Sequence, residues 1–377
     1  MSMESYSIAI DEGVLTDLRE RLRRVRWPDE VENENWARGS RLDYLQELVG
    51  YWIEKFDWRS VERKLNELPQ FKATIDGLGI HFAHVRGRGP SPLPLVVTHG
   101  WPSTFFELSK LLPLLTDPAR HGGDPADAFD VVVPSLPGFG FSDRPRSAGV
   151  HRRVPELWVE LMGRLGYQRF AAQGGDLGGG VTARLGMYHP DRVIGIHVTN
   201  VYGSIGDQDR PASEAELRYL AEVAEWETEE GAYGHMQGTR PQTLAFGLND
   251  SPAGLAAWIV EKLRAWSDCG DDIEQVFSKD EILTTVTIYW ATQTIASSFL
   301  PYYDSRHDPS PRPWQKIDVP CAVALFPRDL THPPREFAER SYNLRQWTEM
   351  PCGGHFAAFE QPELLADDIR QFFRSLR

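Results

Sequence analysis

Apolar residues near the start of the chain recur every three or four positions, which is the spacing of amphipathic helices. Within residues 12–26 they alternate with charged residues, and the same pattern returns over residues 44–52. This region is rich in Trp, Arg and Glu and carries no catalytic grouping of side chains. We therefore predict that residues 1–70 form a helical extension that packs on a larger core.

From residue 71 onward the pattern becomes that of strands. Residues 71–85 predict a hairpin with its turn at Gly77–Gly79. Helical patterns begin near Ser103 and cover about 154–165 and 362–376, and short strand-like runs lie between them at 93–98, 129–134, 169–174, 193–198, 321–326 and 343–350. Short apolar runs that alternate with helices are typical of parallel strands buried on both faces. The fold class predicted is α/β, with a mostly parallel, doubly wound sheet.

The alternation of strands and helices stops between residues 200 and 310. Helical patterns cover 214–230, 253–266 and 281–298, with no strand pattern between them. Open α/β sheets bind ligands at the carboxyl ends of their strands, so an insertion here predicts a cap over that edge. The predicted division is a helical cap at 201–310 and a core made of 71–200 and 311–377.

The most informative stretch is Gly174–Gly178, which follows a strand-like run and precedes a helical pattern. Its sequence has the small-x-nucleophile-x-small pattern of a nucleophile elbow, a sharp turn that lifts one side chain above the sheet. That side chain is Asp176, and a carboxylate at this place suggests attack on an sp³ carbon to form an alkyl ester. Taken alone, the glycines also fit a flexible loop. A dinucleotide-binding interpretation of Gly178–Ala183 fails because the match lies inside the predicted helix.

Two further groups follow later strands in the chain order that α/β-hydrolases use: nucleophile, acid, histidine. Asp329 comes after the strand at 321–326, and His355 comes after the last strand. A histidine suits the general base, and a carboxylate behind it fixes its tautomer and stabilises the imidazolium. Each residue has an ordinary explanation by itself, but their joint placement predicts a catalytic set with Asp176. A Cys–His alternative at Cys352 lacks an elbow.

The charge of the chain narrows the classes of partner. It has 40 Lys and Arg against 54 Asp and Glu, a formal net charge of −14, without a basic run. This balance argues against nucleic acid or an anionic membrane and favours a small neutral substrate. The three scattered cysteines suit neither a disulfide framework nor a zinc site, so we expect the reducing cytoplasm. The sequence contains no signal peptide, membrane span or cluster of metal ligands, and we expect no cofactor and no metal.

Several motifs together resemble those of the microsomal-type epoxide hydrolases. The motifs are His99–Pro102, Gly174–Gly178, Asn249–Ala257, Tyr289–Trp290 with Thr294–Ser298, and Gly353–Glu360. The similarity runs over nearly the whole chain and implies an α/β-hydrolase fold with an inserted helical cap and an N-terminal helical extension. The chain looks most similar to soluble bacterial members linked to antibiotic biosynthesis. We expect no counterpart of the membrane anchor of animal members, and the acid is Asp329 where animal members often have Glu.

This resemblance implies an activity and a role for each residue of the catalytic set. The enzyme would open an epoxide, for instance an aromatic one, with water and release a vicinal diol. Asp176 would be the nucleophile that forms an aspartyl ester, His355 the base that activates water, and Asp329 the acid that orients the histidine. The partners implied are the small-molecule epoxide and water, and a homodimer is possible.

The same resemblance implies roles for residues around the catalytic set. The cap tyrosines Tyr233 and Tyr302 would donate hydrogen bonds to the epoxide oxygen, because a phenol stays protonated at neutral pH. Tyr303 adjoins the second of them and is the alternative donor. The backbone N–H groups of Trp101 and Leu177 would form an oxyanion hole, and the side chain of Trp101 would also wall the substrate pocket.

Two other functions compete with this interpretation. A haloalkane dehalogenase uses an elbow aspartate in the same fold, but it usually places Trp after the nucleophile, where this chain has Leu177. A catalytically silent relative that binds small molecules is the rival from another class. The complete Asp-His-Asp set argues against it, because a binding module has no need for a base that activates water.

Overall fold

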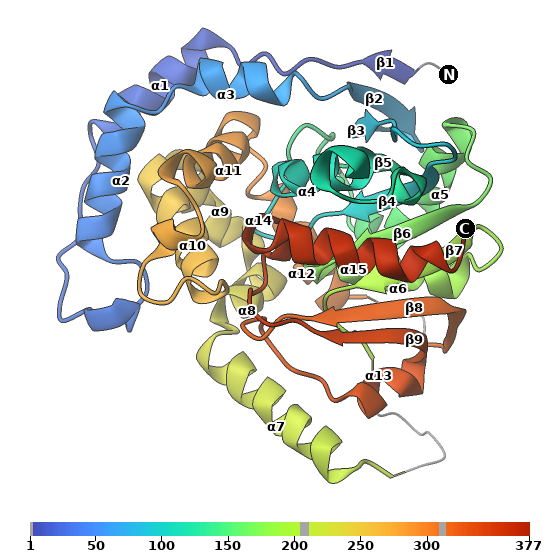
Figure 1. The fold of residues 1–377 in the computed structure, drawn as a ribbon. Coiled ribbons are helices and arrows are strands. Elements are labelled where there is room, and N and C mark those ends of the chain that lie inside the picture. Colours follow the sequence, from blue (N-terminus) through green and yellow to red (C-terminus); the bar gives the residue numbers. More distant parts are fainter. Residues whose placement is uncertain (1–2, 204–210, 309–313) are drawn as a thin grey trace.

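A nine-stranded sheet forms the centre of the protein (Figure 1). The computed structural model describes residues 3–203, 211–308 and 314–377. The order of the strands across the sheet is β1-β2-β3-β5-β4-β6-β7-β8-β9. Along the chain they are β1 Met3–Ser5, β2 Gln70–Ile75, β3 Leu78–Val85, β4 Leu93–Thr98, β5 Phe129–Pro134, β6 Phe170–Gly174, β7 Val193–Val198, β8 Ile317–Leu325 and β9 Tyr342–Glu349.

Helices surround this sheet and also form separate groups at its edges (Figure 1). Those of the first half are α1 Glu12–Leu22, α2 Leu42–Glu54, α3 Trp58–Leu65, α4 Leu111–Thr116, α5 Val154–Arg164 and α6 Asp176–Tyr188. Those of the second half are α7 Glu214–Glu229, α8 Ala232–Thr239, α9 Pro241–Asp250, α10 Pro252–Ala265, α11 Lys279–Thr292, α12 Leu300–Arg306, α13 Arg335–Ser341, α14 Ala357–Glu360 and α15 Pro362–Arg374.

Strands β4 to β9 run parallel to one another, whereas β1, β2 and β3 pair antiparallel. Successive side chains of a strand point to opposite faces, and on β4 this places Val96 in one buried cluster and Leu95 in another. The first cluster contains the apolar sides of α5 and α6, and the second contains those of α4 and α15. The predicted mostly parallel, doubly wound sheet is therefore confirmed.

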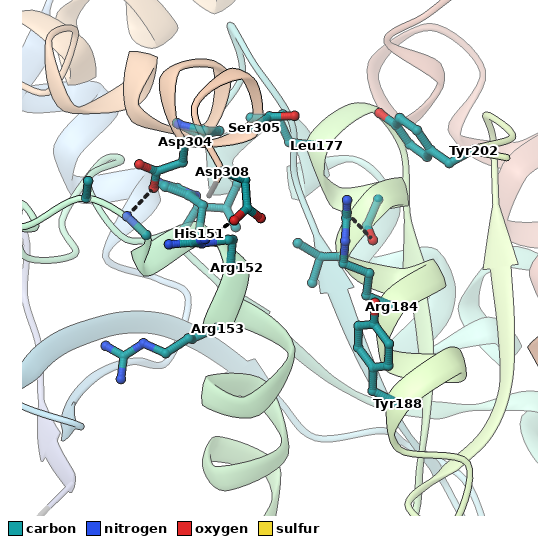
Figure 2. Close-up of a pocket in the computed structure, with 16 residues that line it drawn as sticks. His151, Arg152, Arg153, Leu177, Arg184, Tyr188, Tyr202, Asp304, Ser305 and Asp308 are labelled. Carbon is teal, nitrogen blue, oxygen red and sulfur yellow. Dashed lines mark hydrogen bonds and ion pairs between the residues drawn. The ribbon is translucent and has the colours of Figure 1, made fainter. Parts of the chain in front are cut away.

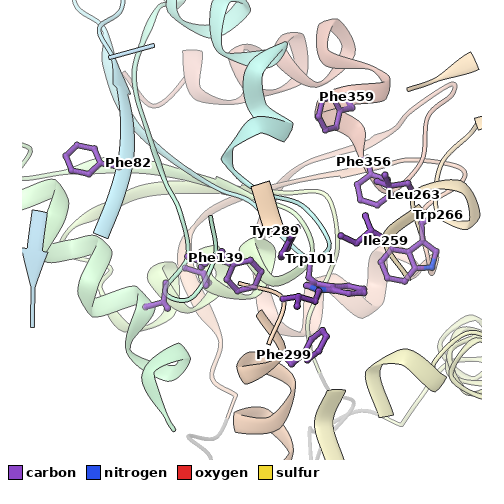
Figure 3. Close-up of a cluster of buried hydrophobic side chains, with 14 of the residues drawn as sticks. Phe82, Trp101, Phe139, Ile259, Leu263, Trp266, Tyr289, Phe299, Phe356 and Phe359 are labelled. Carbon is purple, nitrogen blue, oxygen red and sulfur yellow. The ribbon is translucent and has the colours of Figure 1, made fainter. Parts of the chain in front are cut away.

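Helices α7 to α12 lie between β7 and β8 in the chain, and we refer to them as the cap. Several apolar side chains of these helices and of the segments between them join Trp101 of the core in one buried cluster, among them Trp266 and Phe299 (Figure 3). The ring centroids of Trp101 and Trp266 are 6.1 Å apart in an edge-to-face arrangement that aromatic pairs favour. The cap is thus held over the carboxyl ends of the strands by large buried rings.

The N-terminal helices wrap around the cap as well as the edge of the sheet (Figure 1). Arg21 of α1 forms an ion pair of 2.6 Å with Asp250 of α9. The hydroxyl of Ser40 donates to the carbonyl oxygen of Ala257 in α10, at 2.7 Å. This N-terminal segment therefore contacts the cap from outside, in addition to the core contacts that its sequence pattern predicts.

Two predicted boundaries differ from the structure near the first strands. The hairpin turns at Asp76–Gly77, whose φ angles are 50° and 78°, and both Leu78 and Gly79 already belong to β3. Asp-Gly suits such a two-residue turn because both central positions need positive φ. The helix expected from Ser103 begins as a 3₁₀ helix at Phe105–Ser109 and becomes α-helical only in α4.

In the cap, the helix predicted over 281–298 is shorter than expected. It ends as α11 at Thr292, because Gln293 adopts a left-handed conformation with φ of 53°.

The short elements β1, α8, α9, α12 and α13 were not predicted, since runs of three to ten residues show little periodicity. No helix within the described residues has the length and apolar character needed to cross a bilayer.

Candidate active site

The turn between β6 and α6 has the geometry of a nucleophile elbow. Asp176 is the first residue of α6 and has a φ of 50°, an unfavourable conformation for a residue with a side chain. The neighbouring Gly178 is required for a different reason. A Cβ atom there would lie 1.9 Å from the carbonyl oxygen of Thr98 at the end of β4. The strain thus falls on the aspartate, and the glycine lets the helix approach the strand closely.

Two groups hold Asp176 in this position. The backbone N–H of Trp101 donates to Oδ1 of the Asp176 carboxylate at 2.8 Å. The hydroxyl of Tyr202 donates to the backbone carbonyl oxygen of Asp176, also at 2.8 Å. Leu177 is the second residue of α6, so its N–H belongs to the first turn, where amides have no partner within the helix. The assignment of Trp101 and Leu177 to an oxyanion hole stays a prediction, and no signal in the sequence indicated Tyr202.

The three residues of the predicted catalytic set lie together. Nδ1 of His355 is 2.6 Å from Oδ1 of Asp329, and Nε2 of His355 is 3.5 Å from Oδ2 of Asp176. The side chains of His355 and Asp329 are 5% and 6% exposed, against 16% for Asp176. The imidazole therefore stands between the two carboxylates in a nearly closed site.

The charges around His355 determine its protonation. Burial by itself disfavours the imidazolium, but the carboxylates of Asp329 and Asp176 outweigh it and raise the pKa of His355 well above its usual value. The two neighbouring carboxyl groups therefore favour the imidazolium form of His355 over the neutral ring. Loss of the negative charge on Asp176 would remove one of the two causes of this shift.

A further carboxylate, Glu360, fixes the loop that carries the histidine. Its Oε2 accepts the N–H of Gly354 at 2.9 Å and that of Asp268 at 2.7 Å, and its Oε1 accepts the N–H of Phe356 at 2.9 Å. The residues on both sides of His355 are therefore bound to one side chain. Because Asp268 follows the cap helix α10, this contact also ties the cap to the catalytic loop.

Two cap tyrosines face the core above Asp176. The ring of Tyr233 on α8 stacks on that of Trp101, with centroids 5.2 Å apart, and Tyr302 on α12 meets the same ring edge-on at 6.0 Å. Burial is the main cause that raises the pKa of both phenols, so both stay protonated at neutral pH. Tyr303 lies elsewhere, stacked on His307 with centroids 4.1 Å apart. Of the two adjoining tyrosines, Tyr302 is the one beside Trp101.

A small cavity of about 30 Å³ lies next to the two reactive side chains. Asp176 and His355 line it, together with Glu107, Gln173 and Thr199. Its volume suits one or two water molecules, and the polar side chains offer the partners that a buried water needs. Burial raises the pKa of Glu107 to about 7, with a hydrogen bond to a nearby serine and the charge of His355 acting in the opposite direction. Sequence reasoning missed Glu107, because it lies in an ordinary-looking stretch after the His99–Pro102 motif.

The search for metal and thiol chemistry gives no further candidate. Among residues 3–203, 211–308 and 314–377, no three His, Cys, Asp or Glu side chains are arranged to hold a metal ion. Cys352 carries a free thiol and is not among the residues that line the cavity beside Asp176 and His355.

Comparison with known families agrees with this geometry. The family described as "Epoxide hydrolase N terminus" matches residues 3–108, and the family described as "alpha/beta hydrolase fold" matches residues 94–260. A Stigmatella aurantiaca protein provisionally named an epoxide hydrolase is 45% identical to this chain, covering 99% of it and 85% of the relative. Epoxide hydrolase 1 of Sus scrofa is 36% identical and covers 98% of this chain and 88% of its own.

Solved structures agree along the same length. The Aspergillus niger epoxide hydrolase has a TM-score of 0.87 at 29% identity, covering 100% of this chain and 97% of its own. The juvenile hormone epoxide hydrolase of Bombyx mori has a TM-score of 0.85, also at 29% identity, with 100% and 94% covered. Because relatives of 45% and 36% identity align over nearly its whole length, this chain belongs to the epoxide hydrolase family of the α/β-hydrolase fold.

Proposed function

We propose that this protein hydrolyses an epoxide to a vicinal diol in two steps, through an ester on Asp176. The observation that carries the proposal is the position of this carboxylate. One oxygen is bound by the N–H of Trp101 at 2.8 Å, and the other is 3.5 Å from Nε2 of His355, beneath two protonated phenols. An elbow carboxylate attacks an sp³ carbon, and the phenols stabilise the oxygen that leaves that carbon.

In the first step, an oxygen of Asp176 forms a bond to an epoxide carbon while the bond from that carbon to the epoxide oxygen breaks. Tyr233 and Tyr302 donate hydrogen bonds to the forming alkoxide, which becomes a hydroxyl by taking a proton from one of the two phenols. That phenolate then regains a proton from solvent. The raised pKa of both phenols supports this role, because they remain donors over the physiological pH range. The carboxylate becomes a neutral ester.

Ester formation prepares the second step through charge. One of the two carboxylates that raise the pKa of His355 is now neutral, so the imidazolium loses its proton more readily. Neutral His355 then takes a proton from a water molecule, which attacks the ester carbonyl carbon. Asp329 holds the imidazole through Nδ1. The cavity lined by Glu107 has the volume for that water.

The oxyanion that forms during the second step develops on a carboxyl oxygen of Asp176. The N–H of Trp101 already binds that carboxyl group, and the first-turn N–H of Leu177 is the second donor we assign. Removal of one such preorganised donor raises the barrier by roughly 3–4 kcal/mol in related acyl-transfer sites. Collapse of the tetrahedral intermediate breaks the ester bond, and the leaving oxygen takes the proton that His355 removed from water, which releases the diol. The carboxyl group of Asp176 then loses its proton to solvent, which restores the carboxylate.

The test of this mechanism is to stop the reaction between its two steps. A His355→Gln variant mixed with styrene oxide should gain the mass of one substrate molecule, and peptide mapping should place the added mass on Asp176. The variant His121→Gln, at an exposed histidine, is the matched control and should turn over normally. An unmodified His355→Gln protein, or an adduct on another residue, would contradict the assignment of the nucleophile.

A single turnover of the parent enzyme in heavy-oxygen water gives independent evidence. Water attacks the ester carbonyl in this mechanism, so the first diol should be unlabelled and the label should remain in the Asp176 carboxylate. Label in the first diol would mean that water attacks the epoxide directly, with Asp176 as a base. A chlorinated alkane offered in place of the epoxide tests the dehalogenase alternative, for which we expect no turnover.

The finer organisation of the protein is also part of this proposal. We assign residues 1–70 to an N-terminal extension, 201–310 to the cap and the remainder to the core. Three free cysteines fit a cytoplasmic enzyme. The exposed Leu217 and Leu220 on α7 fit a homodimer contact, which light scattering at several protein concentrations would test.

A further inference from the structure

A cavity of about 660 Å³ extends along one side of α6 (Figure 2). The residues of α6 that line it are Leu177, Gly180, Val181, Arg184 and Tyr188. They recur every three or four positions and therefore share one face of the helix. The stretch from Leu177 to Tyr188 corresponds to roughly 16 Å of helix. Small-molecule sites usually have volumes of ~300–1,000 Å³, so this cavity has the size of a binding site.

One end of the cavity meets the proposed reaction centre. Leu177 directly follows the nucleophile in the chain, and Tyr202, which also lines the cavity, donates its hydroxyl to the backbone carbonyl of Asp176. Pro301 lines the same end and precedes Tyr302. A substrate whose epoxide lies at Asp176 would therefore extend its remaining atoms along α6.

The two arginines on the opposite wall of the cavity already have carboxylate partners. Arg152 forms an ion pair with Asp308, and Arg153 forms one with Asp76. Asp304 accepts a backbone N–H at 2.8 Å. Figure 2 shows Arg152, Asp304 and Asp308 together on this side, facing Arg184 and Tyr188 across the cavity. This wall offers a ligand little net charge.

Arg184 on the α6 side differs from Arg152 and Arg153 in its partners. Within the part of the chain that the structure describes, its guanidinium has no ion pair, and its Nη1 donates only to the carbonyl oxygen of Gly180, at 3.1 Å. A Cβ atom at Gly180 would lie 3.1 Å from the same Nη1 and 3.5 Å from the ring of Tyr202. The guanidinium therefore folds back over Gly180, one helical turn from Asp176, with its remaining donors available.

We propose that Arg184 binds a carboxylate on the substrate, so that the preferred substrates are short epoxy acids. This inference rests on the proposed function and names the substrate class of that site. One helical turn places the guanidinium roughly 6 Å along the axis from Asp176, which suits a carboxylate a few carbons from the reacting epoxide. The planar guanidinium matches the two oxygens of a carboxylate.

The ordinary alternative is that Arg184 is a solvated surface residue, since it is exposed in this structure. Two features favour the binding role. The rest of the α6 face in the cavity carries no other charge, and Gly180 leaves open the space that the guanidinium and a ligand would share. An acid differs from the neutral substrate that the net charge of −14 favours, but a local cation such as Arg184 would offset the long-range repulsion of a single carboxylate.

The experiment compares 5,6-epoxyhexanoate with its methyl ester, which has nearly the same shape and no charge. In the parent enzyme the acid should have the higher kcat/KM. In Arg184→Met the ratio of the acid to the ester should fall roughly tenfold, because one charge-assisted contact at a partly exposed site is lost. The change should appear mainly in KM, since the contact is the same in the bound substrate and in the transition state.

Arg153→Met is the matched control, because it removes the same charge from the same cavity at a residue that already has an ion pair. The ratio should be unchanged in this variant. An unaltered ratio in Arg184→Met, or an equal fall in both variants, overturns the inference.

Binding of hexanoate and hexanamide, followed by tryptophan fluorescence, separates this inference from the proposed function. If Arg184→Met weakens the binding of hexanoate but not that of hexanamide, the anion site is supported whether or not the epoxides are hydrolysed. Failure of the parent enzyme to hydrolyse either epoxide would refute the proposed function. If the parent and Arg184→Met bind hexanoate equally well, and hexanamide equally well, the anion site is refuted. Opening of the epoxide of the methyl ester would in that case leave the proposed function intact.

Discussion

The close contact between α6 and β4 makes Gly178→Ala a sharp test of how the nucleophile is positioned. The added Cβ would lie 1.9 Å from the carbonyl oxygen of Thr98, 2.6 Å from its carbonyl carbon and 2.9 Å from the carbonyl oxygen of His99. All three are backbone atoms at the end of a buried strand, so no side-chain rotation relieves the clash. The first turn of α6 must therefore move away from β4.

The size of that movement sets the expected effect. Real Cβ contacts stay above 3.0 Å, so the separation must grow by about 1.1 Å. Asp176 lies two residues before Gly178 and Trp101 three residues after Thr98, so their 2.8 Å hydrogen bond would be broken. Overpacking costs about 1–3 kcal/mol, and a lost hydrogen bond to a carboxylate adds about 1.5–3 kcal/mol. Because a misplacement of ~1 Å lowers rates by ~100-fold, we expect a comparable fall in kcat.

Urea unfolding measures the loss of stability, and single-turnover kinetics with styrene oxide measure the fall in rate. Gly50→Ala in α2 is the control, because nothing lies within 4 Å of its added Cβ, and this change should stabilise the protein by about 0.5–1 kcal/mol at unchanged rates. The reasoning is refuted if the free energy of unfolding of Gly178→Ala is within about 0.5 kcal/mol of that of the parent and its kcat is within about threefold of the parent's.

Two more predictions concern the phenols and the histidine. Tyr233→Phe and Tyr302→Phe should each slow ester formation by about 10–1,000-fold and the double variant more strongly, as measured by stopped-flow fluorescence, whereas Tyr303→Phe should have little effect because its ring stacks on His307. A sensitive Tyr303→Phe variant with a silent Tyr302→Phe would reverse the assignment. The rate of ester hydrolysis should rise with pH through the pKa of His355, because only the neutral imidazole accepts a proton. The apparent pKa of His355 in the ester intermediate should lie below its raised pKa in the free enzyme, where the Asp176 carboxylate is not esterified. Equal pKa values in the two forms would show that the Asp176 charge does not affect the protonation of His355.

The sequence by itself determined the parallel strands of the sheet and indicated the residues proposed for catalysis. The bounds of β4, β5 and β7 agree with the predicted 93–98, 129–134 and 193–198. These runs are recognisable because a strand buried on both faces is apolar throughout. Asp176 and Asp329 were identifiable because each follows an apolar strand, and His355 because it follows the last strand, whose sequence is more polar. Parallel strands bring their carboxyl ends to one edge of the sheet.

Only the tertiary structure decided which residues surround that edge and in what state. The choice between Tyr302 and Tyr303 depends on how α12 packs on Trp101, and two adjoining tyrosines on a short helix have no distinguishing local pattern. The raised pKa of His355 likewise depends on carboxylates that are distant in the chain. Arg184 also looks like any surface arginine until the fold shows which neighbouring cations have partners. Burial and charge at the site are sums over elements that meet only after folding, so a local sequence pattern does not contain them.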